Sequence, residues 1–124
     1  MDFDQIELLS SIEAATDEAL DALTFGVIGI DQDGNVQRYN SWESRAAGLS
    51  PGKVLGHHLF TVVAPCMNNF MVAQRFEDAL SDGSPLDATI DYVLTLRMRP
   101  IKVKLRLLSD AHVARRYVLV QRPT

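Results

Sequence analysis

The chain has 124 residues, of which 47% are hydrophobic, so it has the size and composition of one domain with one core. Its formal net charge of −4 argues against nucleic acid as a partner, because contact with phosphates requires a basic surface. There is no uninterrupted apolar run of the roughly 18–20 residues that cross a bilayer, and the acidic start lacks the basic residues of a signal peptide. We therefore expect a cytoplasmic protein without a membrane segment.

Charge is distributed unevenly along the chain. Acidic residues precede Arg38 with no Lys or Arg among them, whereas Asp110 is the only acidic residue from Arg97 onward. Opposite charges at the two ends can attract each other within one fold or between two chains of a homodimer, and salt should weaken that attraction. Two separate solvated faces would give the same pattern.

Residues 2–23 favour helix. A partial apolar stripe runs along this segment and consists of Ile6, Leu9 and Ile12. Asp2 or Asp4 can cap its start, and Thr16 and Asp17 weaken its middle, so two short helices are an alternative to one. We interpret residues 1–22 as a helical cap laid on a second unit, residues 23–124.

Two strands are expected next, over residues 25–30 and 36–40. The dipeptide Asp33-Gly34 lies between them and is a strong hairpin signal, because the turn needs a positive φ that glycine adopts without steric cost. The strands should therefore pair in antiparallel fashion. Residues 41–56 lose the periodicity and contain Ser50-Pro51, which indicates short helices and turns.

A further helix is expected after Cys66, ending near Asp82-Gly83. Its residues at core spacing are Val72, Phe76, Ala79 and Leu80. Apolar and polar residues then alternate over residues 91–98, 102–107 and 116–122, which predicts three strands of a sheet with one buried face. The expected fold is α+β, with a five-stranded antiparallel sheet, helices on one face of it and the N-terminal helical cap.

Cys66 is the only cysteine, so it has no disulfide partner within the chain. Asn68 or Asn69 can cap the helix that follows, which would place the thiol beside the positive end of that helix and favour the thiolate. Such a thiol suits the covalent attachment of a ligand. The alternative is an inert cysteine that behaves as a small hydrophobe in the core.

His57 and His58 raise two other interpretations of Cys66. A metal site is disfavoured, because adjacent histidines point in different directions and no further ligand spacing is present. A nucleophilic cysteine with a histidine base would make the protein an enzyme, but the sequence contains neither an oxyanion-hole motif nor a third orienting group. We therefore do not expect an enzyme.

Taken together, the chain resembles the PAS-type sensor domains and, within them, the photoactive yellow proteins. The resemblance extends from Leu20 to Arg122. It is carried by Phe25-Gly26-Val27-Ile28, by residues 33–40, by Glu43, by Val54-Leu55-Gly56 with Phe60, by Val63-Ala64-Pro65-Cys66 with Phe76, by Asp91-Tyr92 and by Lys102-Val103-Lys104. Tyr39, Glu43 and Cys66 together are its most discriminating residues.

The resemblance implies a blue-light photoreceptor in which Cys66 carries a p-coumaroyl (4-hydroxycinnamoyl) chromophore as a thioester, with its phenolate near Tyr39 and Glu43. It also assigns Ala47, Leu49, Leu94 and Met98 to the pocket. Ala47 and Leu49 stand where the family usually has Thr and Arg, and Leu94 and Leu96 stand where it usually has aromatic residues. We therefore expect an absorption maximum or a photocycle rate that differs from the usual range.

A phenolate inside a protein needs donors aimed at its oxygen, and these would be the Tyr39 hydroxyl and a protonated Glu43. Proton transfer from Glu43 after isomerisation would leave a buried carboxylate without a partner, and release of the N-terminal cap to an unknown signalling protein is the expected response. The rival hypothesis is a PAS module that is not photoactive and that binds another ligand or a protein partner.

Overall fold

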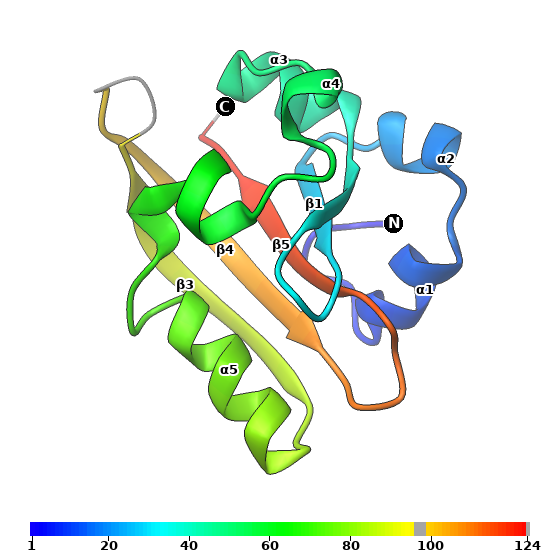
Figure 1. Ribbon diagram of the computed structural model, residues 1–124. Coiled ribbons are helices and arrows are strands. Elements are labelled where there is room, and N and C mark those ends of the chain that lie inside the picture. The colour runs from blue at the N-terminus through cyan, green and yellow to red at the C-terminus, as the bar shows by residue number, and fades with distance from the viewer. Residues whose placement is uncertain (96–98, 124) are drawn as a thin grey trace.

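The computed structural model describes residues 1–95 and 99–123. The helices are α1 (Leu8–Ala14), α2 (Asp17–Asp21), α3 (Ser41–Ala47), α4 (Pro51–Val54) and α5 (Ala73–Asp82), with a π-helical turn η1 (Leu59–Val63) and a 3₁₀ turn η2 (Pro65–Met67). The strands are β1 (Gly26–Ile30), β2 (Val36–Tyr39), β3 (Leu86–Leu94), β4 (Ile101–Ser109) and β5 (Arg116–Gln121). They form one antiparallel sheet in the order β2-β1-β5-β4-β3 (Figure 1), as expected for the predicted fold.

The hairpin between β1 and β2 was predicted correctly. Asp31 Oδ1 accepts hydrogen bonds from the backbone N–H groups of Asp33 and Asn35, and Gly34 has a φ of 88°. Gly34 therefore supplies the positive φ that the sequence indicated, while the side chain that closes the turn is that of Asp31 rather than Asp33.

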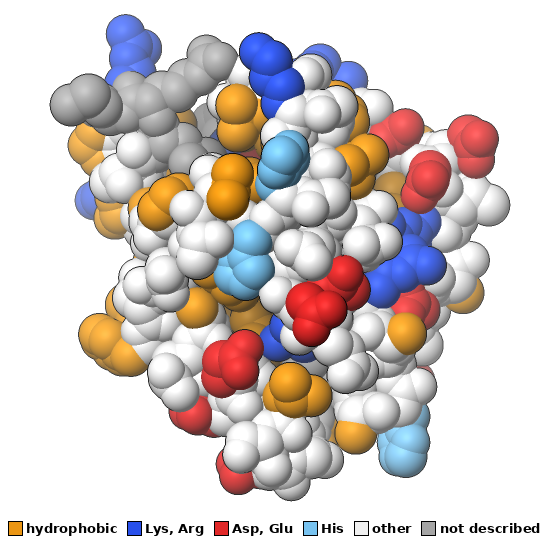
Figure 2. Space-filling model, in the orientation of Figure 1, with side chains coloured by type: hydrophobic (Ala, Val, Ile, Leu, Met, Phe, Trp, Pro, Cys, Tyr) orange, Lys and Arg blue, Asp and Glu red, His pale blue; other side chains and the backbone are white. Residues whose placement is uncertain are grey.

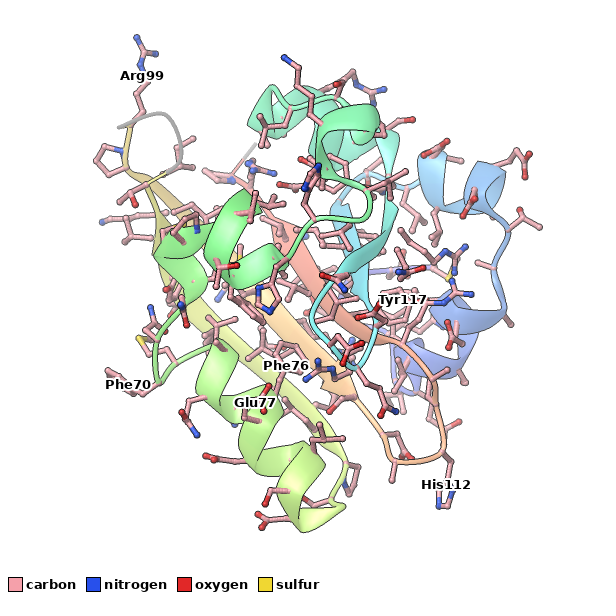
Figure 3. The ribbon with its side chains drawn as sticks, in the orientation of Figure 1. Phe70, Phe76, Glu77, Arg99, His112 and Tyr117 are labelled. Carbon is pink, nitrogen blue, oxygen red and sulfur yellow. The ribbon has the colours of Figure 1, made fainter. Side chains whose placement is uncertain are left out.

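One face of the sheet, which we call the front face, packs against the helical middle of the chain. Its apolar cluster includes Ile28, Leu105 and Val118 from the strands, with Phe60 and Phe76 from the segments that cover them. Figure 3 shows Phe76 pointing from α5 toward the sheet. As predicted, Val72, Phe76 and Ala79 are buried and the helix ends at Asp82, but Leu80 is 46% exposed, because only one face of α5 contacts the sheet.

The opposite face, the back face, packs against the N-terminal segment, residues 1–22. Phe3, Leu8 and Ile12 from this segment contact Leu119 and Tyr117 of β5 in a second apolar cluster. Consequently β1 is buried along its whole length, as is β5 apart from Gln121. The prediction of one buried face was wrong for these central strands, although it holds for the edge strand β3, where exposed residues alternate with more buried ones.

Arginines of the sheet attach the N-terminal segment. Arg38 donates hydrogen bonds to the carbonyls of Ile12 and Ala15 and pairs with Asp17. Arg106 donates to two further carbonyls, those of Phe3 and Gln5. Lys and Arg side chains lie between Asp and Glu side chains in this part of the surface (Figure 2). Arg115 of the basic end pairs with Glu13 of the N-terminal segment at 3.5 Å, so opposite charges from the two ends of the sequence attract each other within the fold.

The N-terminal segment forms two short helices, one of the two alternatives left open. Neither Asp2 nor Asp4 caps the first helix, because α1 begins only at Leu8, after Glu7 in the left-handed region at φ 57°. Thr16, which the sequence marked as a weak point, caps α2 by accepting a hydrogen bond from Ala19 N.

Strand boundaries differ from the prediction on one side of the sheet. β3 begins at Leu86 rather than at residue 91, because it pairs with β4 over its full length, up to Leu94 opposite Ile101. The predicted end of this strand, residues 96–98, lies outside the described residues. Among the residues that are described, no helix has both the length and the apolar character needed to cross a membrane.

Candidate functional site

Tyr39 and Glu43 are brought together at the junction between β2 and α3. Tyr39 is the last residue of β2, and Glu43 lies in the first turn of α3. The chain turns at Asn40, between the strand and the helix. Asn40 Oδ1 accepts hydrogen bonds from the N–H groups of Glu43 and Val27, which caps α3 and fixes it against β1.

Glu43 is paired with Arg122, which follows β5 directly. Arg122 Nη1 and Nη2 donate to Glu43 Oε1 and Oε2 at 2.6 and 3.0 Å, a bidentate arrangement. The side chains of Glu43 and Arg122 are only 2% and 13% exposed. A Cβ at Gly26 would overlap the Glu43 carboxyl, so the absence of a side chain there makes room for it. From the sequence, the Glu43 carboxylate left by proton transfer was expected to have no partner. In the structure, Arg122 lies beside it as a cation.

Burial and neighbouring charge act on both titratable groups of the site. Burial raises the pKa of the Glu43 carboxyl above its ordinary value, and Arg122 opposes that shift through its hydrogen bonds and charge. Burial also raises the pKa of the Tyr39 hydroxyl, with a further increase from the Glu43 charge and an opposing effect from Arg122. Tyr39 therefore stays neutral and can donate a hydrogen bond.

Cys66 lies in η2 and is half-buried against the front-face cluster. Its carbonyl accepts hydrogen bonds from the Tyr92 hydroxyl at 2.6 Å and from Asn69 Nδ2 at 3.2 Å, which hold the turn against β3. Asn69 also accepts from Met71 N and Val72 N, as an N-capping side chain does, but α5 starts only at Ala73. Cys66 thus lies farther from the helix start than predicted.

The remaining predicted pocket residues flank the same cluster. Leu94 is fully buried in it, and Leu49 is partly buried against it. Ala47 is buried at the end of α3, one turn after Glu43. Met98 lies outside the described residues.

The histidines beside η1 have separate contacts. His58 Nδ1 accepts from Phe60 N, and His57 is exposed. Within residues 1–95 and 99–123, no hydrogen bond joins either histidine to Cys66, and no group of three or more His, Cys, Asp and Glu residues could hold a metal ion. These contacts offer no support for a histidine base at Cys66.

The arrangement matches known proteins in both sequence and fold. Residues 20–121 match the model of the PAS fold family. The photoactive yellow protein of Rhodothalassium salexigens is 32% identical over 105 residues, which cover 85% of this chain and 83% of the relative. This chain belongs to the photoactive yellow protein family. That of Rhodobacter capsulatus is 26% identical over 102 residues and 82% of each chain.

The photoactive yellow protein family also provides a close structural match. The photoactive yellow protein domain of the sensor histidine kinase Ppr from Rhodospirillum centenum superposes with a TM-score of 0.82 at 35% identity, covering 91% of this chain and 98% of that domain. PAS domains of this kind are sensory modules, so the chain is a PAS sensory domain of the same family.

Sequence reasoning missed Arg122 as a site residue, although a signal for it was present. Val118 and Val120 face the front cluster, and strand periodicity places residue 122 on the same face. A basic residue in register with two core valines indicates a partner near the core, and Glu43 is the only buried carboxylate among the described residues. The sequence-based interpretations of the basic end, attraction to the acidic start or a solvated face, do not single out Arg122.

Proposed function

We propose that this domain is a blue-light photoreceptor in which Cys66 holds a p-coumaroyl group as a thioester, with Tyr39 and Glu43 beside the phenolic oxygen. The observation that carries the proposal is that the half-buried Cys66 packs against the apolar cluster that contains Tyr39, and that Glu43 acts electrostatically on Tyr39. The names of the relatives point to the same function.

The residues present fit such a group. Arg122 Nε is buried and has no hydrogen-bond partner among the described residues, so an oxygen atom of a ligand would give it one. Leu94 lies in the apolar cluster and Leu49 packs against it, so both would offer apolar contacts to the ring of such a group. The bound group would supply a double bond that light can isomerise.

The protein's own residues would handle the proton. The Tyr39 hydroxyl donates a hydrogen bond, and a protonated Glu43 donates a second one until it gives up its proton. A change in the charge of Glu43 then acts on α3 and, through Asn40, on the N-terminal segment, because Asn40 Nδ2 also donates to the Leu20 carbonyl. Rearrangement of that segment is the proposed signal, received by a signalling protein that the sequence does not identify.

Reconstitution tests this function. The protein is incubated with the activated ester of p-coumaric acid, with Cys66→Ala as control, and its intact mass and absorption spectrum are recorded. A mass increase and a visible band that bleaches in blue light, both absent from the control, are the expected result. A protein that forms no adduct, or an adduct that does not respond to light, would instead be a PAS module for another ligand or a protein partner.

A further inference from the structure

Arg122 presents two hydrogen-bonding edges, and Glu43 occupies only one of them. The end of the guanidinium, Nη1 and Nη2, binds both carboxylate oxygens. The side of the group, where Nε lies, is buried without a partner among the described residues. Since a guanidinium can donate along both edges, the free edge is suited to a second oxygen atom next to Glu43.

The positive charge of Arg122 is balanced by a single negative group beside it. Tyr39 from β2 is the other titratable side chain that acts on the Arg122–Glu43 pair. β1 packs against α3 and contributes no charged residue, and Ala47 and Leu49 add none. From α2, Asp21 accepts a hydrogen bond from Ser41 N at the start of α3. Arg122 is therefore the one cation that the described residues bring to Glu43.

We propose that Arg122 is the counter-ion of this pocket and limits it to one negative charge. The inference rests on the proposed function and deepens it. Without a ligand, Glu43 carries the charge. When an acidic hydroxyl of a ligand lies at the free edge of Arg122, that hydroxyl and Glu43 share one proton. The proton leaves the hydroxyl oxygen and binds a Glu43 carboxylate oxygen, or it moves back to the hydroxyl oxygen, and no other bond changes.

This arrangement alters the expected response to light. A carboxylate left by proton transfer from Glu43 does not stand alone, because Arg122 already contacts both of its oxygens. The domain then needs less local unfolding to accommodate the charge than a pocket without a cation would.

The first test uses the protein without ligand. Infrared difference spectra across a pH titration report whether Glu43 is a carboxylate or a carboxylic acid. In Arg122→Gln, the midpoint of Glu43 protonation should rise by about 1–3 pH units relative to the wild type, and the new carboxylic acid band should disappear in Arg122→Gln/Glu43→Gln. An unchanged midpoint would overturn the proposal. If Arg122→Gln does not fold, the same infrared titration is used to compare Arg122→Lys, which keeps the charge, with Glu43→Gln.

The second test uses the reconstituted protein. The midpoint for ionisation of the bound phenol, followed by absorption, should rise by about 1–3 pH units in Arg122→Gln and by less in Arg122→Lys. Arg45→Gln is the matched control, since Arg45 is an exposed arginine on the same helix as Glu43 and lies over the Trp42 ring. It should titrate like the wild type.

The two proposals fail separately. If the wild type binds no covalent group, the proposed function is wrong, while the infrared titration still decides the role of Arg122. If the loaded wild type and Arg122→Gln titrate at the same pH, Arg122 is not the counter-ion and the photoreceptor function stands.

Discussion

Arginine side chains lie in both faces of the sheet, but their partners differ. On the back face, Arg38 and Arg106 donate both to backbone carbonyls and to carboxylates, and those carboxylates, Asp17 and Asp87, are 84% and 52% exposed. On the front face, Arg116 donates to backbone carbonyls in the same way, whereas Arg122 pairs with Glu43, which is buried with it.

The difference in partners gives the arginines two roles: Arg38 and Arg106 attach a segment of the chain, and Arg122 stabilises a buried charge. A neutral carbonyl or a hydrated carboxylate carries no buried charge that the arginine must neutralise, so the back-face contacts act as hydrogen bonds that attach a segment. A buried carboxylate does depend on its cation, because an unpaired charge in the interior is costly. The stability of the front face should therefore respond to proton binding at the Glu43–Arg122 pair.

Arg122→Met should have the largest effect and tests the front face. Removing one partner of a buried pair costs about 3–5 kcal/mol of unfolding free energy at a pH where Glu43 is ionised. Below its ordinary pKa of 4.5, Glu43 is protonated in both the folded and the unfolded state, and the loss should be small. Burial raises the pKa of Glu43 in the folded state, so the loss of unfolding free energy should grow as the pH rises through this folded-state pKa.

Urea unfolding of this variant between pH 4 and pH 8 checks the prediction. Arg122→Met/Glu43→Gln removes both charges and should recover most of the loss at high pH. A loss that is independent of pH would mean that Arg122 contributes by packing rather than by pairing with Glu43.

Arg106→Met tests the back face and should come next in size. It leaves the carbonyls of Phe3 and Gln5 without their donor, so we expect a loss of about 2–3 kcal/mol and faster proteolysis within residues 1–22. Limited proteolysis with mass spectrometry locates the cleavage. The matched control is Lys104→Met on the same strand, whose pair with Asp91 is exposed and should contribute less than about 1 kcal/mol. Equal protease sensitivity in the two variants would refute the attachment role.

Gly26→Ala should destabilise the front face by about 2 kcal/mol, because the new methyl group occupies the position of the Glu43 carboxyl. The displaced carboxylate also loses its geometry with Arg122. Thermal unfolding measures the change, and Gly52→Ala serves as control, since nothing lies within 4 Å of a Cβ there. If both variants keep wild-type stability, the space at Gly26 is not required by Glu43.

Tyr117→Phe should have the smallest effect, about 1 kcal/mol at neutral pH, on the back face. The Tyr117 hydroxyl donates to Glu13 at 2.7 Å and accepts from Arg38. Figure 3 shows its side chain directed toward the N-terminal helices. Burial, followed by the hydrogen bond to Glu13, raises the pKa of Tyr117 above its ordinary value of 10.0.

The pH dependence of this variant has a defined sign. A raised folded pKa means that the wild-type contribution is complete below about pH 10 and is lost as the pH rises through the folded value. The stability difference between wild type and Tyr117→Phe should therefore shrink in alkali, as unfolding curves at pH 8 and above pH 10 would show. A difference that widens in alkali would contradict this assignment.

Much of the fold could be predicted because local patterns determine it. The Asp33-Gly34 turn and the Gly83 helix end need particular backbone angles, and the residues that adopt them are few. Burial of both faces of β5 could not be predicted from alternation, because Tyr117 and Leu119 are compatible with either an exposed or a covered face. Only the packing of residues 1–22 decides between them.

The site was predictable in part for a similar reason. Cys66, Tyr39 and Glu43 were found from their combination, but Glu43 and Arg122 are 79 residues apart along the chain. Pairing at that separation depends on where β5 lies in the sheet, beside β1, which no local pattern reveals. Figure 1 shows the C-terminal end of the chain next to α3, where the pairing occurs.

Asn40 has a consequence for how motion can pass through the molecule. Its amide is saturated: the oxygen accepts from Val27 and Glu43, and the nitrogen donates to the carbonyls of Leu20 and Phe25. A displacement of α3 must therefore stretch a hydrogen bond to β1 or to the end of the N-terminal segment. One route of mechanical coupling between α3 and the N-terminal segment thus runs through a side chain that has no spare hydrogen-bonding capacity.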